Sequence, residues 1–444
     1  MSDFLPVYIP AAVGTFHMET ADEQFGKSVS LLKGADTRFV CPEDKLLSVG
    51  AIKEFLSDLR PDLVVFQNLT FANAAYISEV LRLCPDSDIL LWTLREPVID
   101  GGRLRLNSLT GAFSAANTLH AFGRENFTYV FGAPDECGTV RKITAAVRAS
   151  EIKHNLKSLK IAAVGHTPQG FGFGRALDAE MMSVFGAELL SVEAREIIET
   201  AKSVTDGECV ESLDKTTCAT CGFDATPCEN RTAHAKLYRA YTKFIEDNGI
   251  GALASRCWPD FFTSYGTPVC AVLSMLNDDG IAAACEADVY GALSMWIGMQ
   301  LSGKPTFFGD PVSLDENENT ITFWHCGAAA CSMAREDTGA VVGVHPNRKI
   351  GPAMDFGCRG FGDATIFRIG RKPDGGFRFF AEEGTALDKP KQFTGTSIVI
   401  RTDGNSRDIV ENSVHDGWEP HFVVIQGRYG EELKILEEML NLNK

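Results

Sequence analysis

Two carboxylates in this chain follow directly on apolar segments. Glu286 comes after residues 281–285, and Asp310 comes after residues 306–308, which end in two phenylalanines. A carboxylate among apolar residues is costly unless a cation or a hydrogen-bond donor pairs with it. If the fold brings the two together, a shared divalent metal ion would supply that partner. The pair therefore predicts a metal site.

Histidines at strand-like positions could complete such a site. His325 follows the apolar run 320–323, His345 follows 341–344, and His421 precedes 422–425. A lone histidine beside a strand is usually structural, although its imidazole is an apt metal ligand. One or two histidines with two carboxylates make an oxygen and nitrogen shell, which favours manganese, magnesium or cobalt over a thiolate zinc site.

The elements that must position these residues alternate between strand-like and helix-like patterns through the first 300 residues. We expect strands at 5–9, 37–40, 63–66, 89–94, 161–165, 251–255 and 281–285, and helices at 21–32, 48–59, 140–156, 177–185, 233–248, 268–277 and 289–301. Such alternation is typical of parallel α/β sheets, where functional residues gather at the carboxyl ends of strands.

Two boundaries divide the chain into three expected domains. The first follows the basic end of a helix near residue 155, and the second comes where β-like runs replace the alternation. We expect an N-terminal α/β domain at 1–155 and a second α/β domain at 156–306 that carries Glu286. A β-rich C-terminal domain at 307–444 would carry Asp310, His325 and His421.

Bulk composition excludes several classes of function. The net charge of −17 argues against binding to nucleic acid or to an anionic membrane. The start of the chain lacks a basic leader, and no apolar run reaches membrane length. The thirteen cysteines are scattered, so we expect reduced thiols in a cytoplasmic protein.

Six short segments carry a resemblance to a known enzyme family. They read CWP at 257–259, CEADV at 285–289, GKP at 303–305, FGD at 308–310, WHCG at 324–327 and HFVVIQG at 421–427. Together they closely resemble the metal-binding core of the L-fucose isomerase family, which is related to the L-arabinose isomerases. The resemblance is strong over residues 251–324, patchy elsewhere and weak before residue 81.

The resemblance implies an L-fucose isomerase-like fold, a homo-oligomer (trimer or hexamer) with active sites between subunits, and a sugar substrate. It also implies that Glu286, Asp310 and His421 bind a divalent metal, Mn²⁺ first and Mg²⁺ or Co²⁺ as alternatives. His325 would be a fourth ligand or a neighbour. The implied reaction is aldose–ketose isomerisation through an ene-diolate, with Glu286 and Asp310 as the proton-transferring pair.

Several arginines point to an anionic sugar. Arg256 stands where many relatives have a lysine before the CWP segment, and its fork-shaped guanidinium suits an oxyanion. Arg105 and Arg175 lie in loop-like positions, and Trp258 belongs to the CWP segment. We expect these four residues to bind substrate, with a sulfonated hexose such as sulfoquinovose as the most specific candidate. Alternatively, the arginines pair with local carboxylates or contact a neighbouring subunit.

Other interpretations remain open. Cys209, Cys218, Cys221 and Cys228 could hold zinc or act as a redox pair, although their irregular spacing favours ordinary loop thiols. The chain could also be a non-catalytic sugar-binding protein on the same fold, or a metal-dependent aldolase or epimerase.

Overall fold

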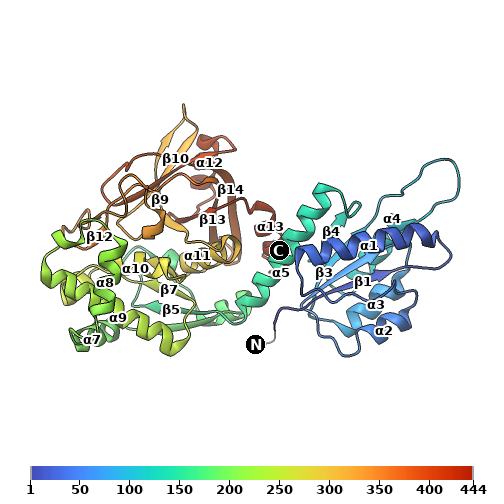
Figure 1. Cartoon of the computed structure of the whole chain (residues 1–444), viewed down its shortest axis with the longest axis horizontal. Coiled ribbons are helices and arrows are strands. Elements are labelled where there is room, and N and C mark those ends of the chain that lie inside the picture. Colours follow the sequence, from blue (N-terminus) through green and yellow to red (C-terminus); the bar gives the residue numbers. More distant parts are fainter. Residues whose placement is uncertain (1–2, 443–444) are drawn as a thin grey trace. The chain divides into compact units, whose positions relative to one another are not determined.

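The computed structural model describes residues 3–442 and divides them into two compact units (Figure 1). Residues 3–155 and 431–442 form unit 1, and residues 156–430 form unit 2. Because unit 2 is compact throughout, the boundary that the sequence predicts at residue 306 remains a prediction.

Unit 1 is built on a four-stranded parallel sheet with strand order β1-β2-β3-β4. The strands are β1 (Pro6–Ala11), β2 (Leu63–Asn68), β3 (Asp88–Thr93) and β4 (Thr128–Phe131). The first three are buried along their whole length, as expected of strands covered on both faces. This is the parallel α/β architecture that the sequence predicts for the first half of the chain.

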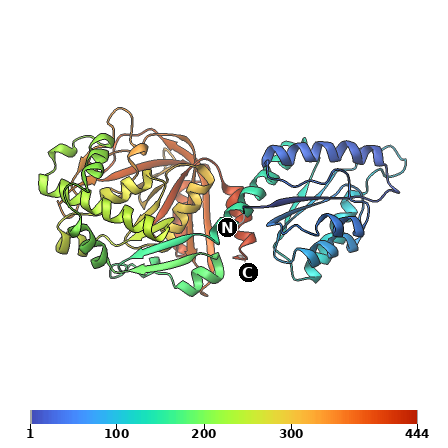
Figure 2. The same cartoon turned by 60° about the horizontal axis from the view of Figure 1, so that its bottom comes forward.

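Helices cover both faces of this sheet (Figure 2). They are α1 (Met18–Ala35), α2 (Val49–Phe55), α3 (Ala74–Leu83), α4 (Ser108–Ala121) and α5 (Cys137–Leu156). The helix α13 (Gly430–Met439) lies beside α5, where Glu431 pairs with Arg141 at 2.9 Å. The α2 helix begins where the Ser48 side chain accepts a hydrogen bond from the Ala51 amide. The strand expected at 37–40 is wrong, because only Val40 forms a bridge, to Val7.

Unit 2 contains a second parallel sheet, with strand order β6-β5-β7-β8. Its strands are β5 (Lys160–Val164), β6 (Glu188–Val192), β7 (Ala252–Ser255) and β8 (Ala282–Cys285). The helices connecting them are the short α6 (Asp178–Glu180), α7 (Ala194–Ser203), α8 (Val210–Ala219), α9 (Cys228–Asn248) and α10 (Cys270–Asp278). The carboxyl end of β8 delivers Glu286.

The rest of unit 2 is a closed antiparallel barrel with strand order β10-β15-β14-β13-β16-β9. Its strands are β9 (Phe307–Asp315), β10 (Thr320–His325), β13 (Gly362–Arg371), β14 (Phe377–Leu387), β15 (Thr396–Thr402) and β16 (Phe422–Gln426). A two-stranded sheet, β11 (Val342–Gly343) with β12 (Ala353–Met354), and the helix α12 (Ser406–His415) complete it. β9 continues beyond the apolar segment 306–308 and through Asp310, because Asp310 pairs with Trp324 of β10.

One helix, α11 (Val289–Ser302), joins the sheet of unit 2 to the barrel (Figure 1). It packs against β5, β7 and β8 on one side and against β9, β13 and β16 on the other. A helix enclosed in this way must be apolar all round, and α11 is buried at every position except Gln300 and Ser302. Two glycines allow this close approach, since a Cβ on Gly291 would lie 2.5 Å from Phe308 Cε2 and one on Gly298 would lie 2.8 Å from Ile425 Cγ1.

No helix among residues 3–442 is both long and apolar enough to span a membrane. All thirteen cysteines are unpaired thiols.

Candidate active site

Glu286 is placed by a sharp turn between β8 and α11. Both Glu286 and Ala287 adopt the left-handed conformation, with φ of 60° and 55°. Residues other than glycine rarely do so, and each such residue costs about 1–2 kcal/mol. The turn ends at Asp288, whose side chain accepts a hydrogen bond from the Gly291 amide and caps α11. Strain of this kind persists where the surrounding structure holds it, as at functional sites.

Three neighbouring barrel strands supply the other candidate ligands. Asp310 lies in β9, His325 ends β10, and His421 directly precedes β16. The register places Trp324 opposite Asp310 and Phe422 opposite Gly309, so all three candidates come to the same end of the barrel. That end faces Glu286.

The four side chains that the sequence singles out meet in one cluster. His421 Nε2 lies 3.0 Å from Glu286 Oε2 and 3.5 Å from Asp310 Oδ1. Three of these residues, Glu286, His325 and His421, each contribute one possible ligand atom, and these atoms lie within 4.8 Å of one another. At this spacing a single metal ion could bind all three. Among residues 3–442 this is the one group of histidine, cysteine and acidic side chains that meets that condition.

Two further residues, which were not among the expected site residues, hold His421 in place. Asp288 Oδ2 lies 2.9 Å from His421 Nδ1, and the fully buried Arg368 lies 2.6 Å from the same oxygen through Nη1. A carboxylate on one ring nitrogen orients the other nitrogen toward a metal. A signal for the pair was present, because Asp288 precedes an apolar helix and Arg368 interrupts an apolar strand.

The electrostatics of the cluster separate its two carboxylates. Burial raises the pKa of Asp310 to about 6, and the charges of Glu286 and Asp288 add to that shift. Burial would also raise the pKa of Glu286, but the His421 hydrogen bond and the nearby His325 outweigh it and lower that pKa. A pair of carboxyl groups with separated pKa values can serve as one acid and one base.

The pKa values of the two histidines shift in opposite directions. Burial opposes protonation of His421, but its hydrogen bonds to Asp288 and Glu286 raise its pKa to about 9. Burial lowers the pKa of His325 to about 4, so this ring stays neutral near pH 7. Its Nδ1 atom is buried and has no hydrogen-bond partner among the described residues. An orphaned neutral imidazole nitrogen beside carboxylates fits a metal ligand.

Aromatic rings surround His421. Phe308 lies 4.8 Å from it between ring centroids, Phe173 lies 5.2 Å away and Phe171 lies 6.3 Å away. The last two belong to the glycine-rich loop after β5, and Gly174 lets that loop pass close to the site, since a Cβ there would lie 2.8 Å from Asp288 Cα. The loop therefore forms part of the wall of the site.

The residues expected to bind substrate have different surroundings. Arg256 Nε lies 2.8 Å from Asp260 Oδ2 and donates to the Trp258 carbonyl at 3.1 Å. Arg175 donates to Thr167 Oγ1 at 2.7 Å and lines a cavity of about 320 Å³ that also includes Ala287. Arg105 belongs to unit 1, where its backbone amide donates to Glu96. The expected role of Arg105 in substrate binding therefore stays a prediction.

The four cysteines of the possible zinc or redox group do not converge. Cys209 is buried, while Cys218, Cys221 and Cys228 are exposed. In the described part of the chain, no three of these cysteines bring their sulfur atoms close enough to share a metal ion. The structure therefore gives no support to a zinc site there.

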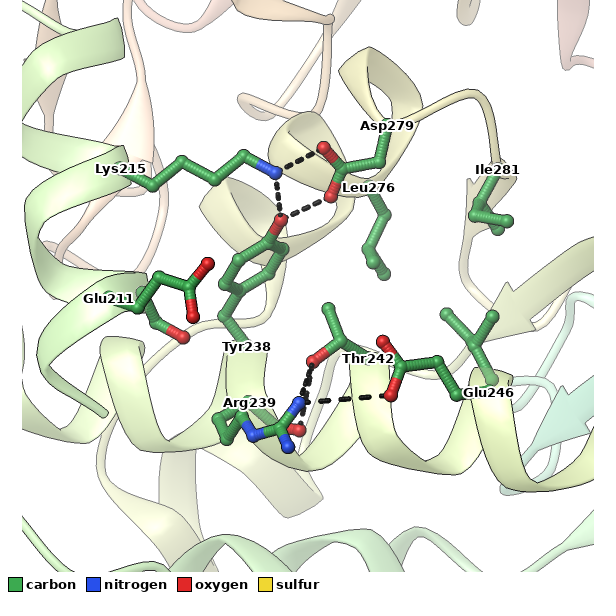
Figure 3. Close-up of a pocket in the computed structure, with 11 residues that line it drawn as sticks. Glu211, Lys215, Tyr238, Arg239, Thr242, Glu246, Leu276, Asp279 and Ile281 are labelled. Carbon is green, nitrogen blue, oxygen red and sulfur yellow. Dashed lines mark hydrogen bonds and ion pairs between the residues drawn. The ribbon is translucent and has the colours of Figure 1, made fainter. Parts of the chain in front are cut away.

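A separate pocket of about 380 Å³ lies between α8, α9 and α10 (Figure 3). Its centre is a hydrogen-bonded group of Lys215, Tyr238 and Asp279, in which the lysine Nζ lies 2.7 Å from the tyrosine hydroxyl. Arg239 Nη1 lies 3.9 Å from Glu246 on the next turns of α9. These charged groups satisfy one another.

Comparison with known proteins gives full-length relatives of one kind. The chain is 60% identical over 444 residues to a sulfoquinovose isomerase of Clostridium sp. (strain MSTE9), covering all of this chain and 99% of that protein. It is 37% identical to one from Priestia megaterium, covering all of this chain and 99% of that protein. It is 35% identical to one from Alkalicoccus urumqiensis, with 98% of each chain covered. No family model matches the chain.

Proposed function

The chain belongs to the sulfoquinovose isomerase family, and from that premise we propose that it converts sulfoquinovose to 6-deoxy-6-sulfofructose with a divalent metal ion. An enzyme of this family is an aldose–ketose isomerase, an intramolecular oxidoreductase. The observation that carries the metal-dependent mechanism is the meeting of Glu286, Asp310, His325 and His421 at the end of the barrel.

Glu286, Asp310 and His421 would hold the ion, with His325 as a fourth ligand or close neighbour. The oxygen and nitrogen donor set favours Mn²⁺, with Mg²⁺ or Co²⁺ as alternatives. When bound, the ion would polarise the sugar carbonyl and stabilise the negative charge of the ene-diolate. Asp288 supports this assignment because its hydrogen bond to His421 Nδ1 leaves Nε2 facing Glu286 and Asp310.

The chain's own carboxylates would move the proton. Isomerisation takes a hydrogen from C2 of the aldose and returns one to C1, so a base and an acid must reach adjacent carbons. Glu286 and Asp310 both lie within 3.5 Å of His421 Nε2 and are therefore close enough to share this work. The aromatic rings around His421 would keep bulk water away from the intermediate.

The test is a product assay on metal-stripped and metal-reloaded protein. We expect the Mn²⁺-loaded protein to convert sulfoquinovose to the ketose, observed by ¹³C NMR, and the stripped protein to lose that activity. A stripped protein that keeps full activity would contradict the metal-dependent mechanism.

The same assay separates the two alternative functions. Cleavage of the carbon chain would show an aldolase, and a C2-inverted aldose would show an epimerase. Saturable sugar binding with no product at all would show a non-catalytic sugar-binding protein.

We also propose that the fold is L-fucose isomerase-like and that the chain forms a cytoplasmic homo-oligomer, a trimer or hexamer, with active sites between subunits. The combination of a parallel sheet with a closed barrel in unit 2 supports the first part. Light scattering of the purified protein measures the subunit number, and a monomer would contradict the second part.

A further inference from the structure

A sulfonated substrate needs a cation for its sulfonate group, and the expected arginines of unit 2 are poorly suited to supply it. Arg256 is already paired with Asp260 at 2.8 Å. Arg175 shares its cavity with the carboxylates of Glu193 and Glu196, which would repel an anion. A guanidinium without a neighbouring carboxylate would serve better.

Arg348 is such a guanidinium. It lies over the indole ring of Trp258, 4.6 Å from the ring centroid, and 5.5 Å from the centroid of Phe262. Within residues 3–442 it forms no ion pair, and its side chain donates no hydrogen bond to the protein. The residue is solvent-exposed, so its donors can be reached by a ligand. Stacking on aromatic faces holds an arginine in one direction and leaves the edge of its fork free.

The backbone around Arg348 is also fixed. The amides of Asn347 and Arg348 donate to Nδ1 of the buried His345 at 3.2 and 3.3 Å. The His345 ring packs edge-on against Phe262, with centroids 5.0 Å apart. Arg348 and its aromatic platform therefore form one packed group.

This group borders the candidate active site. Trp258 lies three residues beyond the end of β7, whose last residue, Ser255, pairs with Cys285 immediately before Glu286. Arg348 lies in the turn between β11 and β12, and the amide of Met354 in β12 donates to the carbonyl of Gly327, two residues after His325, at 3.1 Å. Arg348 is thus near the cluster without being neutralised by Glu286 or Asp310.

We propose that Arg348, stacked on Trp258 and Phe262, binds the sulfonate group of the substrate. This inference rests on the proposed function. Two parallel N–H groups of the fork would donate to two sulfonate oxygens, and the aromatic platform would limit the entropy lost on binding. Trp258 then contributes to substrate recognition by supporting the arginine.

The test compares Arg348→Met with wild type on two sugars. Sulfoquinovose carries the sulfonate, and 6-deoxy-D-glucose has the same carbon skeleton without it. We expect the KM for sulfoquinovose to rise about 10- to 100-fold, the loss typical of a charge-assisted hydrogen-bonded pair. Turnover of the neutral sugar, followed as exchange of its C2 hydrogen in D₂O by NMR, should stay within about twofold of wild type.

Two further variants sharpen the test. Arg348→Lys keeps the charge but loses the fork, so its KM should fall between those of wild type and Arg348→Met. Arg378→Met is the matched control, because Arg378 also stacks on an indole, 4.0 Å from the centroid of Trp418. A second readout is inhibition by ethanesulfonate, which should weaken about tenfold or more in Arg348→Met alone.

The outcomes distinguish this inference from the proposed function. A wild-type chain that does not isomerise sulfoquinovose contradicts the proposed function. A wild-type chain that does, together with an Arg348→Met variant that loses no more than Arg378→Met, contradicts this inference alone. Equal losses on the charged and the neutral sugar contradict it as well.

Discussion

Two regions of unit 2 hold similar side chains but differ in how those side chains are satisfied. The pocket between α8, α9 and α10 contains lysine, tyrosine and acidic groups that pair with one another (Figure 3). In the candidate active site, His421 faces three carboxylates, and His325 Nδ1 has no partner within the described chain. The named groups of the first region pair with one another, whereas the second region keeps a buried imidazole nitrogen without a partner among residues 3–442.

The difference teaches that a cavity alone does not identify a site, and that unpaired chemical groups are a better guide. The pocket of Figure 3 encloses about 380 Å³, yet it contains no cluster able to bind a metal ion. At the active site, a strained turn, a buried ion pair and an orphaned imidazole converge within one small space. Arrangements that cost stability are retained where they serve function.

The largest expected effect is on catalysis. Glu286→Gln removes a carboxylate that would bind the metal ion and transfer a proton. We therefore expect kcat to fall by a factor of about 10²–10⁴ or more. The measurement is kcat with sulfoquinovose, with bound metal determined by mass spectrometry. Glu211→Gln, in the other pocket, is the matched control and should leave kcat unchanged. If both variants retained wild-type kcat, the contrast between the regions would fail.

The next effect is on stability. Asp288 and Arg368 are both almost completely buried and form an ion pair at 2.6 Å. Arg368→Met would leave the Asp288 carboxylate buried without its guanidinium and should lower the free energy of unfolding by about 3–5 kcal/mol. Urea denaturation measures this loss. The double variant Asp288→Asn with Arg368→Met should recover part of it, and no recovery would argue against a paired role.

A smaller effect concerns pH and the helix α9, which carries part of the second pocket. His234 on this helix is fully buried, and burial lowers its pKa to about 3. Since the unfolded chain binds the proton near pH 6.5, the stability contribution of His234 is complete above that pH and is lost as the pH falls toward 3. The loss at pH 5 should be about 2 kcal/mol.

His234→Gln tests this pH dependence, because glutamine does not titrate. Denaturation between pH 7 and pH 5 should show a shallower fall in stability for the variant than for wild type. Identical slopes would show that His234 does not remain neutral in the folded protein.

The smallest effect is expected in the pocket of Figure 3. Asp279→Asn weakens the group formed with Lys215 and Tyr238 at a partly exposed position. The expected cost is about 1 kcal/mol in the free energy of unfolding, with no change in kcat or KM. A change in kcat would show that this pocket communicates with the active site.

The sequence predicts those site residues that stand next to a recognisable local segment. The apolar run before Glu286 and the FGD segment before Asp310 are visible in the linear chain. The assignment of His421, 111 residues after Asp310, depended on a family resemblance, because the pairing of β9 with β16 joins segments far apart in sequence. Closure of the barrel was not predicted for the same reason, since strand register is set by non-local contacts.

The positioning residues were harder to foresee. Asp288 has the pattern of an ordinary helix cap, and nothing local indicates that its side chain also holds His421. Arg368 lies in a strand whose neighbours are apolar, and its partner is 80 residues earlier. The strand expected at 37–40 failed because β propensity alone does not supply a neighbouring strand for a full ladder.

The position of α11 has a thermodynamic consequence. Glu286 precedes this helix on the sheet side, while Asp310, His325 and His421 belong to the barrel on its other side. Any ligand that contacts both sets can bind only when sheet and barrel are packed against each other. By linkage, such a ligand must stabilise that packing, and loss of the ligand removes this stabilisation. Ligand affinity at this site is therefore also a measure of cohesion within unit 2.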